Sequence, residues 1–288
     1  MRSAERLDDR ILRSILSTIT DVKKRVAGEI ASAGSDWNQR RLGDLVGRLN
    51  RTGADMARDL SKSMAAHGHD KYTLGAKAVD AILREFSGGT DTIRRGYDLA
   101  QLSVLSEYSA DLLTKLSAEQ IGSVSSALRL GMIGGRSPTD IIRDIGVRLI
   151  DEDGEPAPGI WGDTLRRAEV VYRTEGNRVL SIAQQVRMRQ HDEEWPGLKK
   201  TWLHSLKPPG RARPSHVRAE RDYGPGGRPG PIPQGDEFVL HVGIDESSKS
   251  FPPGEYPCMF PRDPALPAAA SILCGCAVAP WRDGWEDL

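Results

Sequence analysis

The carboxyl-terminal part of the chain contains all three cysteines of this 288-residue protein, Cys258, Cys274 and Cys276. Cys274 and Cys276 are two positions apart, and side chains two apart in an extended segment point to the same side. Thiolate sulfur and imidazole nitrogen are ligands that Zn²⁺ prefers in structural sites. The pair therefore predicts a structural zinc site in which His216 supplies a nitrogen.

Three residues could supply the fourth ligand of such a site: His204, His241 or Cys258. Two alternatives need no metal. Reduced cysteines can pack as small apolar groups. A catalytic cysteine paired with His216 is a further alternative, but no activating helix terminus is evident beside the cysteines.

A second group of polar residues lies inside an apparent helix, Arg173-Thr174-Glu175. Residues two apart on a helix point to different faces, so Arg173 and Glu175 each need a separate partner. Glu175 could act as a general base. No nucleophile is spaced nearby, and we favour structural ion pairs for both charges.

A third group combines basic residues with an aromatic one. Lys199, Lys200, Arg211 and Arg213 lie on either side of Trp202. Basic side chains grip phosphates and an indole can stack on a base, so these four residues are candidates for nucleic-acid contact. A tryptophan in a strand-like segment is more often part of a core.

The overall composition restricts the function classes. Forty basic and forty acidic residues give a formal net charge of zero, which argues against a dedicated nucleic-acid coat protein. Residues 166–228 carry fourteen basic against seven acidic side chains, and residues 229–288 carry three against nine. We expect the two segments to neutralise each other. No apolar run reaches the roughly 18 residues of a membrane helix. The amino terminus contains acidic residues and has no apolar segment of the kind found in a secretory signal, so no such signal is expected. An odd cysteine count is typical of a protein made in a reducing cytoplasm.

Proline usage divides the chain into two parts. Only Pro138 lies within the first 150 residues, and the other seventeen prolines follow. Because proline breaks helix interiors, we predict a helical region over 1–150, a linker over 151–160 and an α+β domain over 161–288. Apolar residues at steps of three and four predict helices over 7–30, 42–64, 74–86 and 93–116.

Short local signals predict where the helices end. The stretch HGHDK, residues 67–71, is expected to interrupt the second helix and to leave His67 and His69 in solvent. Ser117 and Gln120 have the spacing of a capping box at a helix start. Ser137 and Pro138 offer another helix start.

After a long helix over 161–190, the pattern changes to short strand-like segments separated by loops rich in glycine and proline. The fold class is therefore α+β. Long amino-terminal helices, either bundled or extended, precede a small α+β domain with a short antiparallel sheet. No catalytic triad, carboxylate dyad or nucleotide-binding loop is evident, so an enzyme is not predicted.

The order of the motifs resembles the phage minor head proteins of the Mu F-like, head-morphogenesis family. The resemblance covers about residues 125–278. The matching positions are Gly135 and Ser137, Arg173 to Glu175 with Asn177, Trp202, Arg213 with His216, Phe238, Pro261 to Pro264 including Asp263, and Cys274 to Cys276. Three positions depart from the pattern: Arg262 replaces a common Gly, Leu273 the usual Asn and Gly275 the usual Arg.

The resemblance implies a minor capsid protein of a tailed bacteriophage, located in the virion inside the head and made in the host cytoplasm. It implies association with the portal protein, in several copies, and a role in head assembly and in DNA packaging, retention or ejection. Scaffold protein, major capsid protein and packaged DNA are further expected partners, and no membrane is expected. The alternative is a metal-dependent nuclease or transferase centred on Glu175, His216, Cys274 and Cys276. A toxin-like effector is a third alternative, because Mu F-like domains are sometimes joined to toxins.

Overall fold

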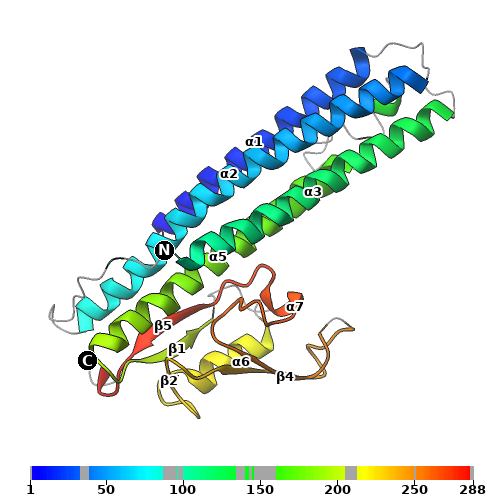
Figure 1. Cartoon of the computed structure of the whole chain (residues 1–288). Helices are drawn as coiled ribbons and strands as arrows, with labels where there is room; N and C mark the ends of the chain where they lie inside the picture. Colours follow the sequence, from blue (N-terminus) through cyan, green and yellow to red (C-terminus); the bar gives the residue numbers. More distant parts are fainter. Residues whose placement is uncertain are drawn as a thin grey trace. The chain divides into compact units, whose positions relative to one another are not determined.

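The computed structural model is an α+β protein, as predicted, with long helices in its amino-terminal half and small antiparallel sheets near the carboxyl end (Figure 1). Its contacts divide the chain into two compact units. Unit 1 comprises residues 1–67 and 104–172, and unit 2 comprises residues 68–103 and 173–288. The structure describes residues 2–32, 39–86, 96, 100–133, 140–142, 145, 160–204, 213–249 and 251–285.

Unit 1 is a helical bundle around one apolar core. Helix α1 spans Arg2–Ser32, and its apolar stripe is buried against residues of three other helices. These helices are α2 (Gln39–Phe86), α3 (Ala100–Ile133) and α5 (Ile160–Glu194). Long parts of α2 and α5, and the first residues of α3, belong to unit 2. The fully buried members of the stripe are Ile15, Ile19, Val22, Val26 and Ile30. An isolated helix is only marginally stable in water, so α1 depends on the burial of this stripe for most of its stability.

Helix α2 runs without a break through the segment that was expected to interrupt it, so the prediction of two separate helices is wrong. His67 is fully buried, and its ring lies 4.6 Å from the ring of Tyr172. It follows Met64 by three positions and therefore continues the buried stripe of the helix. Only His69 is exposed as expected. Packing on the stripe outweighs the weak helix preference of this polar segment.

The predicted capping box is also wrong, because Ser117 and Gln120 lie in the middle of α3. The Ser117 hydroxyl donates to the carbonyl of Leu113 at 2.8 Å, one turn earlier. The Gln120 carbonyl oxygen accepts a hydrogen bond from Thr164 of α5. The expected helix start at Ser137 and Pro138 lies outside the described residues.

Unit 2 is built on the second parts of α2 and α5. Strand β1 (Lys199–Leu203) is the centre of a three-stranded antiparallel sheet, between β2 (Ile232–Pro233) and β5 (Ala277–Trp281). Strands β3 (Phe238–Val242) and β4 (Gly254–Cys258) form a two-stranded sheet with Phe238 opposite Cys258. Two helices that the sequence did not predict complete the unit, α6 (Pro214–Tyr223) and the short α7 (Ala268–Ser271).

A second apolar core lies inside unit 2. It joins Val79 and Leu83 of α2 and Met188 of α5 to side chains from both sheets, with Trp202 and Phe238 fully buried at its centre. An ion pair joins the basic segment 166–228 to the acidic segment 229–288. Lys199 binds Asp283 at 2.7 Å across the β1–β5 edge.

The two compact units are not continuous in sequence, unlike the predicted division into residues 1–150, 151–160 and 161–288. The predicted linker stays a prediction, because residues 151–159 lie outside the described residues. None of the helices in the described part of the chain combines the length and hydropathy that a membrane-spanning helix needs.

Two glycines of α2 give a test of helix packing. A Cβ atom at Gly75 would lie 2.7 Å from the carbonyl oxygen of Leu180, whereas a Cβ at Gly43 would have no neighbour within 4 Å. We expect Gly75→Ala to lower the free energy of unfolding by about 1–3 kcal/mol. The matched control Gly43→Ala should raise it by up to about 1 kcal/mol, because alanine favours helix. Urea denaturation checks both, and stabilisation by Gly75→Ala would contradict the close approach of α2 to α5.

Candidate functional site

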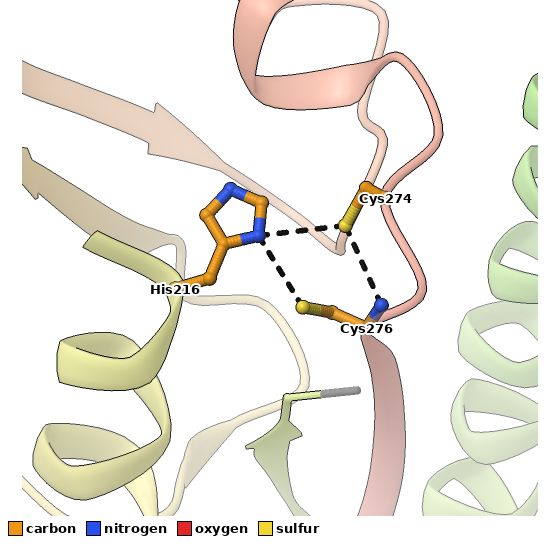
Figure 2. Close-up of side chains that lie close together, drawn as sticks. All are labelled: His216, Cys274 and Cys276. Carbon is orange, nitrogen blue, oxygen red and sulfur yellow. Dashed lines mark hydrogen bonds between the residues drawn. The ribbon is translucent and has the colours of Figure 1, made fainter. Parts of the chain in front are cut away.

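Three side chains with metal-binding atoms meet in unit 2: His216, Cys274 and Cys276. Their ligand atoms all lie within 4.8 Å of one another. The Nδ1 atom of His216 is 3.3 Å from the sulfur of Cys276 and 3.4 Å from the sulfur of Cys274. Figure 2 shows the imidazole facing both sulfurs. The structure thus brings together the three residues that the sequence predicted as zinc ligands.

The histidine is held by the start of a helix. Pro214 stands in the first turn of α6, where its missing N–H costs nothing, and His216 follows in the same turn. Glu246 caps this helix from a distant loop. Its carboxylate accepts hydrogen bonds from the Ser215 amide at 2.7 Å and from the Ser215 hydroxyl at 2.8 Å. These bonds fix the position from which the imidazole points at the sulfurs.

The cysteines lie in the loop that joins α7 to β5, and not in a strand as the sequence analysis assumed. The amide of Cys276 donates to the sulfur of Cys274 at 3.4 Å. Leu273, just before the pair, has a positive φ of 52°. A tight turn, and not the alternation of a strand, places both sulfurs on one side.

The cluster is almost completely buried. His216, Cys274 and Cys276 are 3%, 1% and 3% exposed. The imidazole meets the ring of Trp202 edge to face, with centroids 5.6 Å apart. Trp202 is fully buried, so it belongs to the core and is not available to stack on a base. The Nε2 atom of His216 has no hydrogen-bond partner among the described residues.

The electrostatic surroundings favour a thiolate at Cys274. Its pKa is lowered by the hydrogen bond with Cys276, and then by His216 and by the positive charge of Arg262, although burial acts in the opposite direction. Cys258 differs, because burial raises the pKa of its thiol. Of these two thiols, Cys274 therefore has the electrostatic surroundings that favour a thiolate, the form that binds a metal or acts as a nucleophile.

The Arg-Thr-Glu segment of α5 holds the loop that carries the cysteines. The Thr174 hydroxyl accepts a hydrogen bond from the Leu273 amide at 3.1 Å. Glu175 forms a buried ion pair with Arg178, whose Nη1 lies 2.6 Å from one carboxylate oxygen and 2.5 Å from the other. Burial raises the pKa of Glu175, and the charge of Arg178 opposes that shift. Because both oxygens are engaged, the carboxylate serves as an anchor.

Arg262 links this ion pair to the cluster. Its carbonyl accepts a hydrogen bond from Nε of Arg178 at 2.9 Å. Its own guanidinium donates to the carbonyl of Cys274 at 2.7 Å and to the hydroxyl of Ser181 at 2.5 Å. Burial lowers the pKa of Arg262, while the negative charges of Cys274 and Cys276 act to raise it. A cation is thus fixed beside the two sulfurs.

Arg262 and Leu273 share an unusual backbone conformation. Their φ angles are 69° and 52°, and they are the only residues other than glycine with positive φ in the described part of the chain. An L-residue with a Cβ pays about 1–2 kcal/mol in this region, which glycine and asparagine enter more readily. Both are positions where the sequence departs from the head-morphogenesis pattern, in which they carry Gly and Asn.

The remaining motif residues also have structural partners. Asn177 accepts a hydrogen bond from Lys71 of α2 at 3.5 Å. Asp263 accepts bonds from the amides of Met259 and Ala265, which closes the turn after β4. Arg213 donates to the carbonyl of Ile272 at 2.7 Å. Arg173 is half-buried in α5.

The three described residues of the predicted nucleic-acid group all have partners within the protein. Lys200 is fully buried and donates to the carbonyl of Met259 at 2.9 Å, so its assignment to phosphate contact is wrong. Burial lowers its pKa to about 8. Lys199 is paired with Asp283, and Arg213 is bound to a main-chain carbonyl. Arg211 lies outside the described residues.

The residues proposed as a fourth zinc ligand have other positions. His204 binds Glu220, with 2.5 Å between Nδ1 and the carboxylate, and His241 lies 3.2 Å from Glu255. Cys258 pairs with Phe238 in the two-stranded sheet. In the described part of the chain, the metal-ligating group consists of His216 and the paired cysteines alone.

Sequence reasoning missed four residues that support the site: Arg178, Ser181, Glu246 and the side chain of Arg262. The spacing of Arg178 three positions after Glu175 is a recognisable signal for an ion pair on one helix face. The other three act across long sequence separations, which no local pattern reveals. The arrangement can bind a soft divalent cation or hold a thiolate against an imidazolium, and its burial leaves little access for a substrate.

The buried ion pair of α5 gives a second test. Glu175→Gln and Arg178→Met should each lower the free energy of unfolding by about 3–5 kcal/mol, because each leaves a buried charge without its partner. The double variant should lose clearly less than the sum of the two. Asp55 and Arg58 form a matched exposed pair at 3.1 Å, and Asp55→Asn should cost no more than about 0.5 kcal/mol. Additive losses at Glu175 and Arg178 would contradict the coupling.

The positive φ of Leu273 gives a third test. Leu273→Asn should raise the free energy of unfolding by about 1 kcal/mol, because asparagine tolerates the left-handed region. Leu273 is 39% exposed, so some apolar burial is lost as well, and the gain has to be judged against a residue of equal exposure. The neighbouring Ile272 is the matched control, since it is 40% exposed and has φ of −61°. Ile272→Asn should give no gain, and equal effects of the two changes in thermal unfolding would contradict the backbone argument.

No protein-family model matches the sequence, and no curated protein or solved structure shows significant similarity to it. The resemblance to the head-morphogenesis family therefore depends on the order of short motifs in the sequence.

Proposed function

We propose that this protein is a minor capsid protein of a tailed bacteriophage that acts in head morphogenesis. In this proposal it associates with the portal protein inside the head, in several copies, and contributes to head assembly and to packaging, retention or ejection of DNA. Unit 2 is then a compact structural module whose motif residues hold its fold together.

One observation carries the proposal: the two positive φ angles occur where the family pattern has glycine and asparagine. Arg262 and Leu273 depart from that pattern in residue type, yet their backbone has the conformation that the usual residues favour. A chance match of short motifs would give no reason for this agreement. We therefore interpret Arg262 and Leu273 as substitutions within a shared backbone design.

The convergence of the motifs supports the same proposal. Thr174, His216 and Cys274 come from segments separated by up to about a hundred positions, yet they act on one loop. Arg213 binds the same loop through the carbonyl of Ile272. Residues that a family pattern lists in order are therefore neighbours in space, as expected for a set selected to build one site.

The alternative, a metal-dependent nuclease or transferase centred on Glu175, His216, Cys274 and Cys276, has less support. Both oxygens of Glu175 bind Arg178, so the carboxylate cannot take a proton from a substrate without losing its counter-ion. The cluster residues are at most 3% exposed, which leaves no route for a nucleic acid to the sulfurs.

The helical unit supplies a rigid body for docking in this proposal. Its stripes are buried among its own helices, so the bundle does not need a partner to cover its core. Its outer faces are free to contact the portal protein, the scaffold or the major capsid protein. Several basic residues of the chain's second half have acidic partners within the protein, among them Arg178, Arg187 and Lys199, and in this proposal DNA is a secondary partner.

Co-expression tests the proposal. The full chain is produced with the portal and major capsid proteins encoded in the same genome, and particles are separated on a density gradient. We expect the chain to sediment with procapsids in few copies per particle, and to bind the portal protein when the capsid protein is omitted. Portal and capsid proteins produced without the chain provide the background.

A chain that is absent from particles and does not bind the portal protein would overturn this assignment. Cleavage of plasmid DNA by the purified protein, lost in His216→Ala with unchanged far-ultraviolet circular dichroism, would instead favour the nuclease.

A further inference from the structure

The cluster of His216, Cys274 and Cys276 has the donor set of a thiophilic metal site. We propose that these three side chains bind one Zn²⁺ ion, which fastens the first turn of α6 to the loop before β5. The proposal concerns the stability of unit 2 and does not depend on a role in a phage head.

The distances between the donor atoms suit this ion. Zinc bound at about 2.3 Å from sulfur and about 2.0 Å from nitrogen in a tetrahedron separates its nitrogen and sulfur ligands by about 3.5 Å. The observed separations from Nδ1 of His216 are 3.3 Å and 3.4 Å. Both N–S separations are within a few tenths of an ångström of this value, and the two sulfurs lie within 4.8 Å of each other, which suits an ion between the imidazole and the sulfurs.

The groups around the cluster favour a thiolate at Cys274, and binding of zinc would release the proton of Cys276. The Cys276 amide donates to the Cys274 sulfur, and the guanidinium of Arg262 is fixed next to both cysteines through the Cys274 carbonyl. Two thiolates, a neutral imidazole and a divalent cation have no net charge. A neutral complex can remain in a site that is at most 3% exposed, whereas two unbalanced thiolates would carry a large desolvation cost there.

The fourth coordination position belongs to a small ligand. The described residues place no fourth histidine, cysteine or carboxylate in this group. His204 and His241 are engaged by Glu220 and Glu255 on other parts of the unit. We therefore assign the fourth position to a water molecule.

Burial assigns the ion a structural role. Catalytic zinc sites with three protein ligands keep their open position accessible to substrate. Here the imidazole packs against Trp202, and the cysteines are enclosed by the apolar core of unit 2. The ion would cross-link positions 60 residues apart in the chain, and its binding energy would add to the folding energy of the unit.

Metal analysis of the wild-type protein is the primary experiment. The full chain, purified under reducing conditions, is loaded with Zn²⁺ or Co²⁺ and freed of excess metal. We expect one equivalent of zinc by elemental analysis. The cobalt form should show sulfur-to-cobalt charge-transfer absorption and the intense visible bands of a tetrahedral site. Removal of zinc by a chelator should lower the melting temperature, and added zinc should restore it.

Variants then locate the ion. Cys276→Ser and His216→Ala should weaken cobalt binding by at least the roughly 10- to 100-fold that loss of an outer partner costs a metal site. Cys258→Ser is the matched control, because this buried cysteine lies outside the cluster, and it should still bind one equivalent. Circular dichroism of each variant separates loss of a ligand from loss of the fold.

Two results would overturn the proposal. The first is reduced wild-type protein that binds neither metal in stoichiometric amount and whose stability does not respond to zinc. The second is loss of binding in Cys258→Ser equal to the loss in Cys276→Ser, with both variants folded. A disulfide between Cys274 and Cys276 in protein purified without reductant, together with no metal uptake after reduction, would assign the pair to redox chemistry.

Discussion

A chain of buried charges holds the carboxyl-terminal loops of unit 2 to its long helix. Glu175 neutralises Arg178, Arg178 binds the carbonyl of Arg262, and the guanidinium of Arg262 binds the carbonyl of Cys274. Each member is almost fully buried, so each would be costly without the next. The loop with the cysteines has little regular structure of its own, and this chain fixes its path. The position of both sulfurs relative to His216 therefore depends on the ion pair between Glu175 and Arg178 in α5.

The conformation of Arg262 shows how such a network can offset local strain. A positive φ disfavours arginine, and glycine would avoid that cost. Glycine, however, has no side chain to bind Cys274 and Ser181. With arginine, the same turn gains two hydrogen bonds and a cation close to both sulfurs. Arginine is thus disfavoured by the backbone conformation of the turn, but its side chain stabilises the loop that carries the cysteines.

The sequence predicted the helices well where one physical signal dominated. The stripe from Ile15 to Ile30 has the period of a helix, and α1 buries it as a single face. Predictions were wrong where a polar residue was assigned to a turn or a helix cap from its immediate sequence neighbours. His67 was expected in solvent and Ser117 at a cap, but both lie inside long helices because neighbouring apolar positions determine the packing. Capping signals have small energies, and a buried stripe outweighs them.

The residues that supply the donor atoms of the candidate site could be predicted, but the backbone and the side chains that position them could not. Cysteine and histidine are rare here and have distinctive chemistry, so His216, Cys274 and Cys276 could be selected from their residue types alone. The backbone that joins them could not be predicted in the same way. An alternating strand was expected, whereas a turn at Leu273 and a helix start at Pro214 place the atoms. Arg262 and Glu246 contribute through contacts across 12 and 31 positions, and these separations leave no periodic trace.

The same burial that supports a structural assignment also limits the chemistry that the cluster can carry out. A thiolate beside an imidazole is a common nucleophile arrangement when a substrate can reach it. In unit 2 the sulfurs face His216 and are enclosed by the core around Trp202. Chemistry at this site would first require the loop 272–276 to leave α5, which means breaking the bond from Leu273 to Thr174 and separating Cys274 from Arg262. The interactions that assemble the donors are therefore the ones that close the site, and an assembled cluster of this kind serves the fold.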